Sequence, residues 1–418
     1  MLVSYPQPVP EPPNASVAPP QSEAMDRRYI SNNLPPQVLQ YDPSEYLKAS
    51  LEATLKQTPP RTSYQDNHLG GLYTGYTGLA YLFLCISSLH PDLKVLGHDC
   101  RFWAERYLKG SRENLRIRRG NCGISCEKLA FQAVRACITK DPADVTDFVS
   151  NAPALIGPYM DSEDDPFPAD VITGRAGALY LMRMVRHWVP SMAVCIDSPM
   201  DRLIEKMIEK NDDGNFKWSW HGKRSLGAAH GEIGIITQLV LSKPSLAGHL
   251  ANRLKELLDL QQDGNWPSSE KNGETGRTDL VQWCHGAPGF VYSLQALRPH
   301  FPAMRPSHPD IRVRLDAAIA DAKELVWEKG LLTKEPSLCH GILGNALILP
   351  RGAKRDHFLS LATPASIRRV RAQDAKMFEP AHYGKTPSVM MHYHPSAAWA
   401  WAVCDQENPG MIMYSERL

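Results

Sequence analysis

The sequence predicts an all-α protein in which about seven helical hairpins form a closed α/α toroid. Three observations favour this fold: apolar residues recur at helical spacing, no convincing set of alternating strands is present, and a G-x-x-G motif repeats along the chain. Helical hairpins in series either stack into an open solenoid or close into a ring. We favour the ring, because glycines at the helix starts let backbones approach closely where the units crowd together.

Helical spacing is clearest in four segments, which read SEYLKASLEATLKQT, AGALYLMRMVRHWV, MDRLIEKMIEKN and LAGHLANRLKELLDLQQ. Before them, YPQPVPEPPNASVAPPQSE is dense in proline and offers little to bury, which predicts a disordered arm. We therefore expect two parts, a Pro-rich arm over residues 1–40 and one toroid domain over residues 41–418.

The G-x-x-G motif sets the period of the repeat. Successive first glycines are 57, 55 and 55 residues apart between Gly174 and Gly341, the length of one helical hairpin with its loops. A degenerate element at Gly123 divides the longer interval of 99 residues before Gly174, and one further period reaches Ser396, where SAAW replaces the glycines. The five complete motifs begin at Gly75, Gly174, Gly231, Gly286 and Gly341.

Composition excludes several classes of function. The formal net charge is +1, with 46 basic and 45 acidic side chains, so no overall field favours nucleic acid or an anionic membrane. No apolar run approaches the roughly 20 residues of a membrane span. Nine scattered cysteines and the absence of a signal-peptide pattern indicate a reducing compartment, and we expect a cytoplasmic protein.

Aligning the motifs on their first glycine brings reactive residues into register. The residue before this glycine is His230, His285 or His340 in three successive units, and the one before that is Cys284 or Cys339 in the last two. Equivalent positions of a ring face the same central region, so Cys284, Cys339 and His340 are expected to converge. Two thiolates and one imidazole suit Zn²⁺ in a site that leaves one position open.

Neighbouring residues allow competing interpretations. His230 suits a general acid or base, but a histidine hydrogen-bonded to backbone at a helix start would give the same pattern. Asp170, in PADVITG, is either a catalytic carboxylate or a helix cap. His285 is expected to position ligands or substrate, because three metal ligands are already supplied. Cysteines outside the register, such as Cys122 and Cys126, are interpreted as inert buried thiols.

Five stretches together resemble the motif series of the LanC-like proteins, eukaryotic relatives of the bacterial lanthionine cyclases. They read GYTGLAYLFL, ITGRAGALYLM, LGAAHGEIGI, LVQWCHGAPGFVYSL and LLTKEPSLCHGILGNALIL, and the resemblance covers roughly residues 45–400. It implies a double-layered α/α toroid with a central zinc held by Cys284, Cys339 and His340. It also implies that His230 is the acid–base histidine and that Asp170 is an active-site carboxylate.

The resemblance implies thioether chemistry. Bacterial members add peptide thiols across dehydroalanine or dehydrobutyrine, and eukaryotic members bind glutathione and add its thiol to dehydroamino acids in damaged proteins. Zinc would hold the thiol as a thiolate, and an acid would protonate the enolate that follows addition. Association with a membrane surface occurs among relatives, although this sequence does not require it.

Glutathione contacts implied by the resemblance are less evenly retained. Lys334 matches the lysine five residues before the second zinc cysteine, whereas the family's Arg-Thr-Pro-Asp is similar to KTPS, formed by Lys385, Thr386, Pro387 and Ser388. The family's closing Ser-Leu-Phe-Glu-Gly motif corresponds to HYHPSAAW, which lacks both the glutamate and the glycines. No pattern places the two histidines of MHYHP.

Two functions therefore stay open. One is a zinc-dependent enzyme that activates a thiol, first of all glutathione, for addition to a dehydroamino acid or a related electrophile. The alternative is a regulatory module that binds zinc and glutathione without turnover. Prenyltransferase-like and glycosidase-like barrels are disfavoured, because neither a zinc carboxylate nor a carboxylate pair stands at repeat-equivalent positions.

Overall fold

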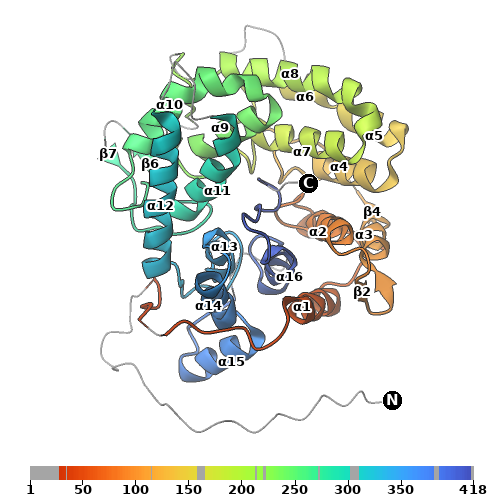
Figure 1. Cartoon of the computed structure of the whole chain (residues 1–418). Helices are drawn as coiled ribbons and strands as arrows, with labels where there is room; N and C mark the ends of the chain where they lie inside the picture. Colours follow the sequence, from red (N-terminus) through yellow and green to blue (C-terminus); the bar gives the residue numbers. More distant parts are fainter. Residues whose placement is uncertain are drawn as a thin grey trace.

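The computed structural model describes residues 28–33, 35–113, 115–157, 165–211, 214–219, 223–271, 274–301, 310–380 and 386–415. The proline-dense segment expected to be disordered lies outside these residues, as does Lys385. Two layers of helices surround a common centre, as Figure 1 shows.

The inner layer is a closed ring of helices. Each packs against the next, and the last packs against the first, so the toroid expected from the repeat is confirmed (Figure 1). These helices are buried on nearly all faces, which explains their largely apolar sequences. Among the described residues they are α2 (Tyr76–Leu89), α4 (Glu127–Thr139), α7 (Arg175–Trp188), α9 (Glu232–Ser242), α11 (Ala287–Leu297), α13 (Ile342–Ile348) and α16 (Tyr393–Val403).

The outer layer covers the ring with amphipathic helices. Outer helices α3, α5, α8, α10, α12 and α14 pack against the inner helices that precede them, whereas α1 packs against α16. The last inner helix and the first outer helix thus complete one hairpin, which joins the two ends of the domain. The outer helices are α1 (Pro43–Gln57), α3 (Cys100–Leu108), α5 (Pro142–Val149), α6 (Ala152–Ile156), α8 (Ala193–Glu209), α10 (Ala247–Asp259), α12 (Ile311–Lys329), α14 (Ala353–Leu361) and α15 (Pro364–Gln373).

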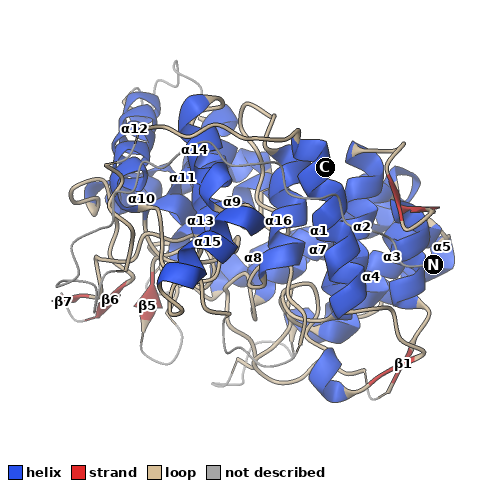
Figure 2. Cartoon of the chain, turned by 90° about the horizontal axis from the view of Figure 1, so that it is seen from below, coloured by secondary structure: helices blue, strands red, loops and turns tan. Residues whose placement is uncertain are grey.

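Strands are short and lie in the loops at the edge of the molecule (Figure 2). β1 (Ser63–Tyr64) pairs in parallel with β4 (Ser111–Arg112), and β2 (Lys94–Val95) pairs antiparallel with β3 (His98–Asp99). A three-stranded antiparallel sheet contains β5 (Arg224–Ser225), β6 (Ser269–Lys271) and β7 (Glu274–Thr275). Short 3₁₀ turns are η1 (Asp66–His68), η2 (Pro190–Met192), η3 (Pro244–Leu246) and η4 (Arg298–His300).

Backbone hydrogen bonds connect the loops that start the inner helices. They link neighbouring units around the ring, which places the starts of all seven inner helices on one face. The donor and acceptor pairs are Leu72 N to Ile124 O (2.7 Å), Cys122 N to Thr173 O (2.7 Å), Val171 N to Ala229 O (3.2 Å), Cys284 N to Cys339 O (3.3 Å), Cys339 N to Met390 O (2.8 Å) and Gly75 N to Pro387 O (2.6 Å).

The second glycine of each motif is required by close packing. In every complete unit the carbonyl oxygen six residues earlier lies where a Cβ would stand. The distance from an added Cβ to that oxygen is 2.2 Å at Gly78, 2.0 Å at Gly177, 2.1 Å at Gly234, 2.0 Å at Gly289 and 2.0 Å at Gly344. These glycines therefore let the backbone approach closely, as expected, but each of these carbonyls belongs to the loop of the glycine's own unit and not to a neighbouring one.

Two degenerate units differ in register from the sequence alignment. Helix α4 is capped by Cys126 and α16 by His392, so these residues, rather than Gly123 and Ser396, stand where the other units have their first glycine. The last interval, from Gly341 to His392, is 51 residues instead of 55. Loop lengths vary, whereas packing in the ring fixes where each helix starts. Pro395 replaces the second glycine within the first turn of α16, where proline is tolerated.

The segment that precedes α1 contacts the domain earlier than the predicted boundary at residue 41. Ile30 N donates to Leu331 O at 2.7 Å, Thr333 N donates to Arg28 O at 3.1 Å, and the Asn32 side chain donates to Trp327 O at 2.7 Å. These backbone groups find partners beside α12. Residues 28, 30 and 32 therefore contact the toroid, although they fall in the range predicted as the arm.

Candidate metal centre

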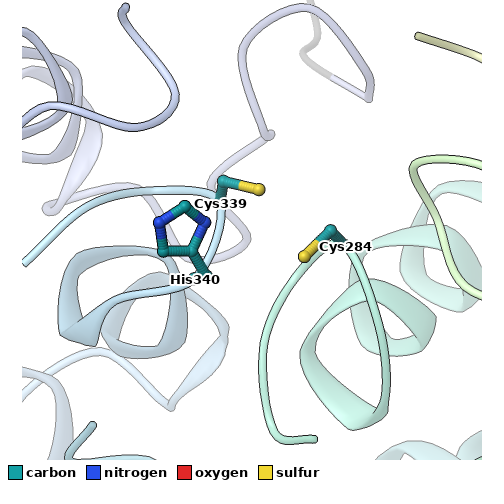
Figure 3. A group of neighbouring side chains, drawn as sticks. All are labelled: Cys284, Cys339 and His340. Carbon is teal, nitrogen blue, oxygen red and sulfur yellow. The ribbon is translucent and has the colours of Figure 1, made fainter. Parts of the chain in front are cut away.

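Cys284, Cys339 and His340 meet at the starts of α11 and α13. Their ligand atoms all lie within 4.8 Å of one another, the one such group of three in the described residues. Cys284 comes from one loop, Cys339 and His340 come from the next, and both sulfurs turn toward the space between the loops (Figure 3). The bond from Cys284 N to Cys339 O holds the two loops together.

The two thiols lie side by side, and each changes the pKa of the other. Hydrogen bonding from Cys339 holds the pKa of Cys284 well below its usual value, and His340 acts in the same direction against the effect of burial. The hydrogen bond with Cys284 and burial raise the pKa of Cys339 well above its usual value, and the charge of Cys284 adds to this shift. The pair therefore loses its first proton more readily than its second.

This donor set fits zinc. Two sulfurs and one imidazole are ligands that Zn²⁺ prefers, and such donors around a tetrahedral zinc stand about 3.5–3.8 Å apart, since Zn–S is about 2.3 Å and Zn–N about 2.0 Å. Cys339 and His340 are buried, whereas Cys284 is half-buried. Three protein donors are the number that catalytic zinc sites supply, with a fourth position left to water or substrate.

His230 and Asp170 form a second pair on the same face of the ring. His230 Nδ1 lies 3.5 Å from Asp170 Oδ2, and the His230 side chain is 47% exposed. Burial lowers the pKa of His230, but the hydrogen bond and the charge of Asp170 outweigh it, so the pKa stands above its ordinary value. The Cys284 sulfur also raises this pKa, to a smaller extent than Asp170.

A model of the family described as lanthionine synthetase C-like protein matches residues 44–357. The chain belongs to this family. A Danio rerio relative named glutathione S-transferase LANCL1 is 28% identical over 317 residues, which cover 72% of each chain. The Arabidopsis thaliana LanC-like protein GCL1 is 37% identical over 189 residues, 42% of this chain and 40% of that protein.

Nisin cyclase provides a solved structure of the same fold. It superposes on this LanC-like chain with a TM-score of 0.50 and 11% identity, over 89% of this chain and 94% of its own. At that identity the likeness concerns the fold alone. Within the part of the chain that the structure describes, no helix has the length and apolar character needed to cross a membrane.

Asp170 of this LanC-like chain holds the turn before α7 and also contacts His230. Its Oδ1 accepts a hydrogen bond from Thr173 N at 2.7 Å and its Oδ2 accepts one from the Thr173 hydroxyl at 2.8 Å. It therefore shapes the turn before α7, although Gly174 is the residue at the cap itself. The same carboxylate faces His230.

His285 and Lys334 flank the candidate ligands. The Nδ1 atom of His285 is buried and has no hydrogen-bond partner among the described residues, and burial lowers the pKa of this imidazole. Lys334 is exposed, and its charge acts on both Cys339 and His285. An exposed ammonium near the thiols suits an anionic ligand group.

The remaining residues of KTPS join the last loop to the first. Pro387 O accepts from Gly75 N, the Thr386 hydroxyl donates to Asn67 O, and the Ser388 hydroxyl donates to Tyr73 O at 2.6 Å. Ser388 is fully buried, so its hydroxyl is occupied within the fold instead of facing a ligand. Lys385, as noted, lies outside the described residues.

Two residues near the sulfurs were missed from the sequence. The Gln282 amide donates to Cys284 Sγ at 3.0 Å, and the Tyr73 hydroxyl lies 3.3 Å from Cys339 Sγ. Tyr73 stands two positions before Gly75, the register position of both ligand cysteines, so the alignment held a signal for it. Gln282 carried no such signal, because its contact depends on the turn between Gln282 and His285.

Proposed function

We propose that this protein is a zinc-dependent enzyme that activates a thiol, glutathione first among the candidates, for conjugate addition to dehydroamino acids in peptides. The observation that carries the proposal is the meeting of Cys284, Cys339 and His340 on the face where His230 and Asp170 pair. The name of the zebrafish relative, a glutathione S-transferase, supports a thiol substrate.

Cys284, Cys339 and His340 would hold the zinc ion. When bound, zinc supplies Lewis-acid stabilisation of a substrate thiolate near neutral pH. The chain's own residues then orient the partners. Lys334 offers a cation to a carboxylate of glutathione, and the half-buried side of Cys284 leaves access for the thiol. We propose a reducing compartment, the cytoplasm, because free thiols are both ligands and substrate.

His230 is proposed to move the proton. The thiol gives its S–H proton to solvent as it becomes a thiolate. As the sulfur then bonds to the β-carbon of the alkene, the C=C π bond breaks and its electrons pass to the carbonyl as an enolate. An imidazolium at His230 returns one proton to the α-carbon, so the product is a neutral thioether. Asp170 stabilises that imidazolium through its contact at 3.5 Å.

The test uses the full-length chain, with metal analysis and mass spectrometry of a dehydroalanine peptide incubated with glutathione. We expect about one zinc per chain and a thioether adduct whose formation stops when the metal is removed. Freshly purified protein without bound zinc would disprove the proposal. His230→Ala should keep the zinc but slow the adduct by about 10²–10⁴-fold, the usual contribution of a general acid.

The altered seventh unit favours one alternative, a module that binds zinc and glutathione without turnover. His392 and Pro395 stand where the complete units have glycines. Calorimetry separates the two functions: glutathione binding without an adduct on any dehydroamino-acid peptide would support the module, whereas turnover excludes it.

A further inference from the structure

The last described turn of the chain lies inside the ring. Met411, Ile412, Met413 and Tyr414 are each no more than 1% exposed. Figure 1 shows the last described part of the chain, in dark blue, within the circle of inner helices next to α16. This turn is therefore part of the core and not a surface tail.

Tyr414 bonds to three inner helices other than α16. Its hydroxyl lies 2.5 Å from Ser293 Oγ on α11, and its carbonyl oxygen accepts from Gln238 on α9 at 3.0 Å and from Arg183 on α7 at 3.4 Å. Ser293 is seven residues beyond Gly286, which places it about 10 Å along the helix from the face that carries the candidate metal centre. Tyr414 thus fills the ring interior beneath that face.

Trp283 connects Tyr414 to the ligands. The two aromatic rings meet edge to face, with centroids 5.4 Å apart and an interplanar angle of 85°. Trp283 directly precedes Cys284 and is 1% exposed. Its indole Nε1 is buried without a hydrogen-bond partner among the described residues, so packing orients this ring. A buried aromatic pair of this geometry contributes about 0.5–1.5 kcal/mol beyond its burial.

We infer that Tyr414 is a positioning residue for the metal centre, which orients Trp283 and thereby sets the place of the Cys284 sulfur. The inference rests on the proposed function, because it takes Cys284 as a zinc ligand. It also implies that substrates reach the site from the face of the helix starts, since the C-terminal turn occupies the interior below. Mutation of a residue that orients a metal ligand typically lowers metal affinity by about 10–100-fold.

The test compares three variants of the full-length chain. Tyr414→Leu removes the ring that contacts Trp283, Tyr414→Phe removes only the bond to Ser293, and Phe301→Leu is a control at an equally buried aromatic beyond the far end of α11. Zinc affinity is measured by competition with a chelator. The absorption bands of the cobalt-substituted protein report the thiolate geometry, and thermal melting reports stability.

We expect Tyr414→Leu to weaken zinc binding by about 10–100-fold and to shift the cobalt bands. Tyr414→Phe should stay within about threefold of the wild type, and Phe301→Leu should lower the melting temperature without changing either metal readout. A Tyr414→Leu protein that melts like Phe301→Leu and keeps wild-type affinity and bands would overturn the inference.

Trp283→Phe examines the same contact from its other side, and it stands in if Tyr414→Leu does not fold. Trp283→Phe should also weaken zinc binding. The double variant with Tyr414→Phe should bind zinc at most about threefold more weakly than the weaker-binding single variant. Wild-type affinity in Trp283→Phe would contradict the inference. Absence of zinc from the wild type is a different result, because it would disprove the proposed function instead.

Discussion

The Nδ1 atom of His230 lies 3.5 Å from Oδ2 of Asp170, although the two residues belong to different units of the ring. Asp170 is fixed by two hydrogen bonds from Thr173, so its carboxylate does not depend on His230 for its position. The imidazole therefore lies beside a preset negative charge. This arrangement stabilises the protonated form of His230 and holds its pKa above the ordinary histidine value.

Asp170→Asn should lower the pKa of His230. The amide keeps an oxygen for Thr173 N but removes the charge that holds the pKa above its ordinary value. If the imidazolium is the acid, activity falls as pH rises through this pKa, and the variant's alkaline limb moves to lower pH. The pH profile of adduct formation measures this shift, and Asp279→Asn, at an exposed carboxylate paired with Arg277, should leave it unchanged.

The contribution of the His230–Asp170 pair to the free energy of unfolding should also fall as pH rises. Because the folded-state pKa of His230 is raised, the pair stabilises the fold fully below the ordinary histidine pKa of about 6.5, and this contribution is lost as pH rises through the raised value. Asp170→Asn should thus cost more stability at pH 5.5 than at pH 8.5. Equal losses in urea unfolding at both pH values would contradict the linkage.

Cys284→Ala and Cys339→Ala should each lose most of the bound zinc, because two protein donors remain from three. Metal analysis after gel filtration measures the stoichiometry. Cys122→Ala is the matched control, since Cys122 is a fully buried free cysteine outside the group and burial raises its pKa well above normal. If the Cys339→Ala protein kept one full equivalent of zinc, Cys339 would not be a zinc ligand.

Chelation of the metal should lower the melting temperature by a few degrees without unfolding the protein. A ligand that binds only the native state stabilises it according to its concentration relative to Kd. The core is a continuous cluster that extends from α1 to the C-terminal turn, so folding does not depend on one ion. Far-UV circular dichroism of the metal-free protein should therefore remain helical, and a coil spectrum would refute this prediction.

Much of the ring followed from the sequence because its determinants are local. In each complete unit, the second glycine marks the start of a helix, because the carbonyl six residues earlier packs against it. The shared register of the motifs brings Cys284, Cys339 and His340 together. The degenerate units were misaligned by a few residues, since Cys126 and His392 replace the marker itself.

Contacts between distant segments could not be predicted in the same way. The pairing of α1 with α16 and the position of Tyr414 beneath Trp283 join parts of the chain that share no repeat register. Nothing in MIMYSERL distinguishes a buried turn from an exposed end. The bond of Gln282 to Cys284 likewise depends on a turn geometry that spacing does not specify.

Gly289→Ala should destabilise the fold and weaken zinc binding together. In the interior of a helix alanine is ordinarily favoured over glycine by about 1 kcal/mol. Here an added Cβ would lie 2.0 Å from the carbonyl oxygen of Trp283. Because that atom is backbone, the loop must shift, at a cost of about 1–3 kcal/mol for overpacking. The loop that shifts carries Cys284, so urea unfolding and chelator competition should both report the change.

Gly120→Ala separates strain from displacement of the site. Gly120 has φ +79° and no atom within 4 Å of an added Cβ, so alanine there costs about 1–2 kcal/mol through left-handed strain alone. Its zinc affinity should equal that of the wild type. If Gly289→Ala matched Gly120→Ala in both measurements, the close approach at Trp283 would not govern the position of Cys284. A loss of affinity confined to Gly289→Ala would show that packing at the start of α11 places the ligand.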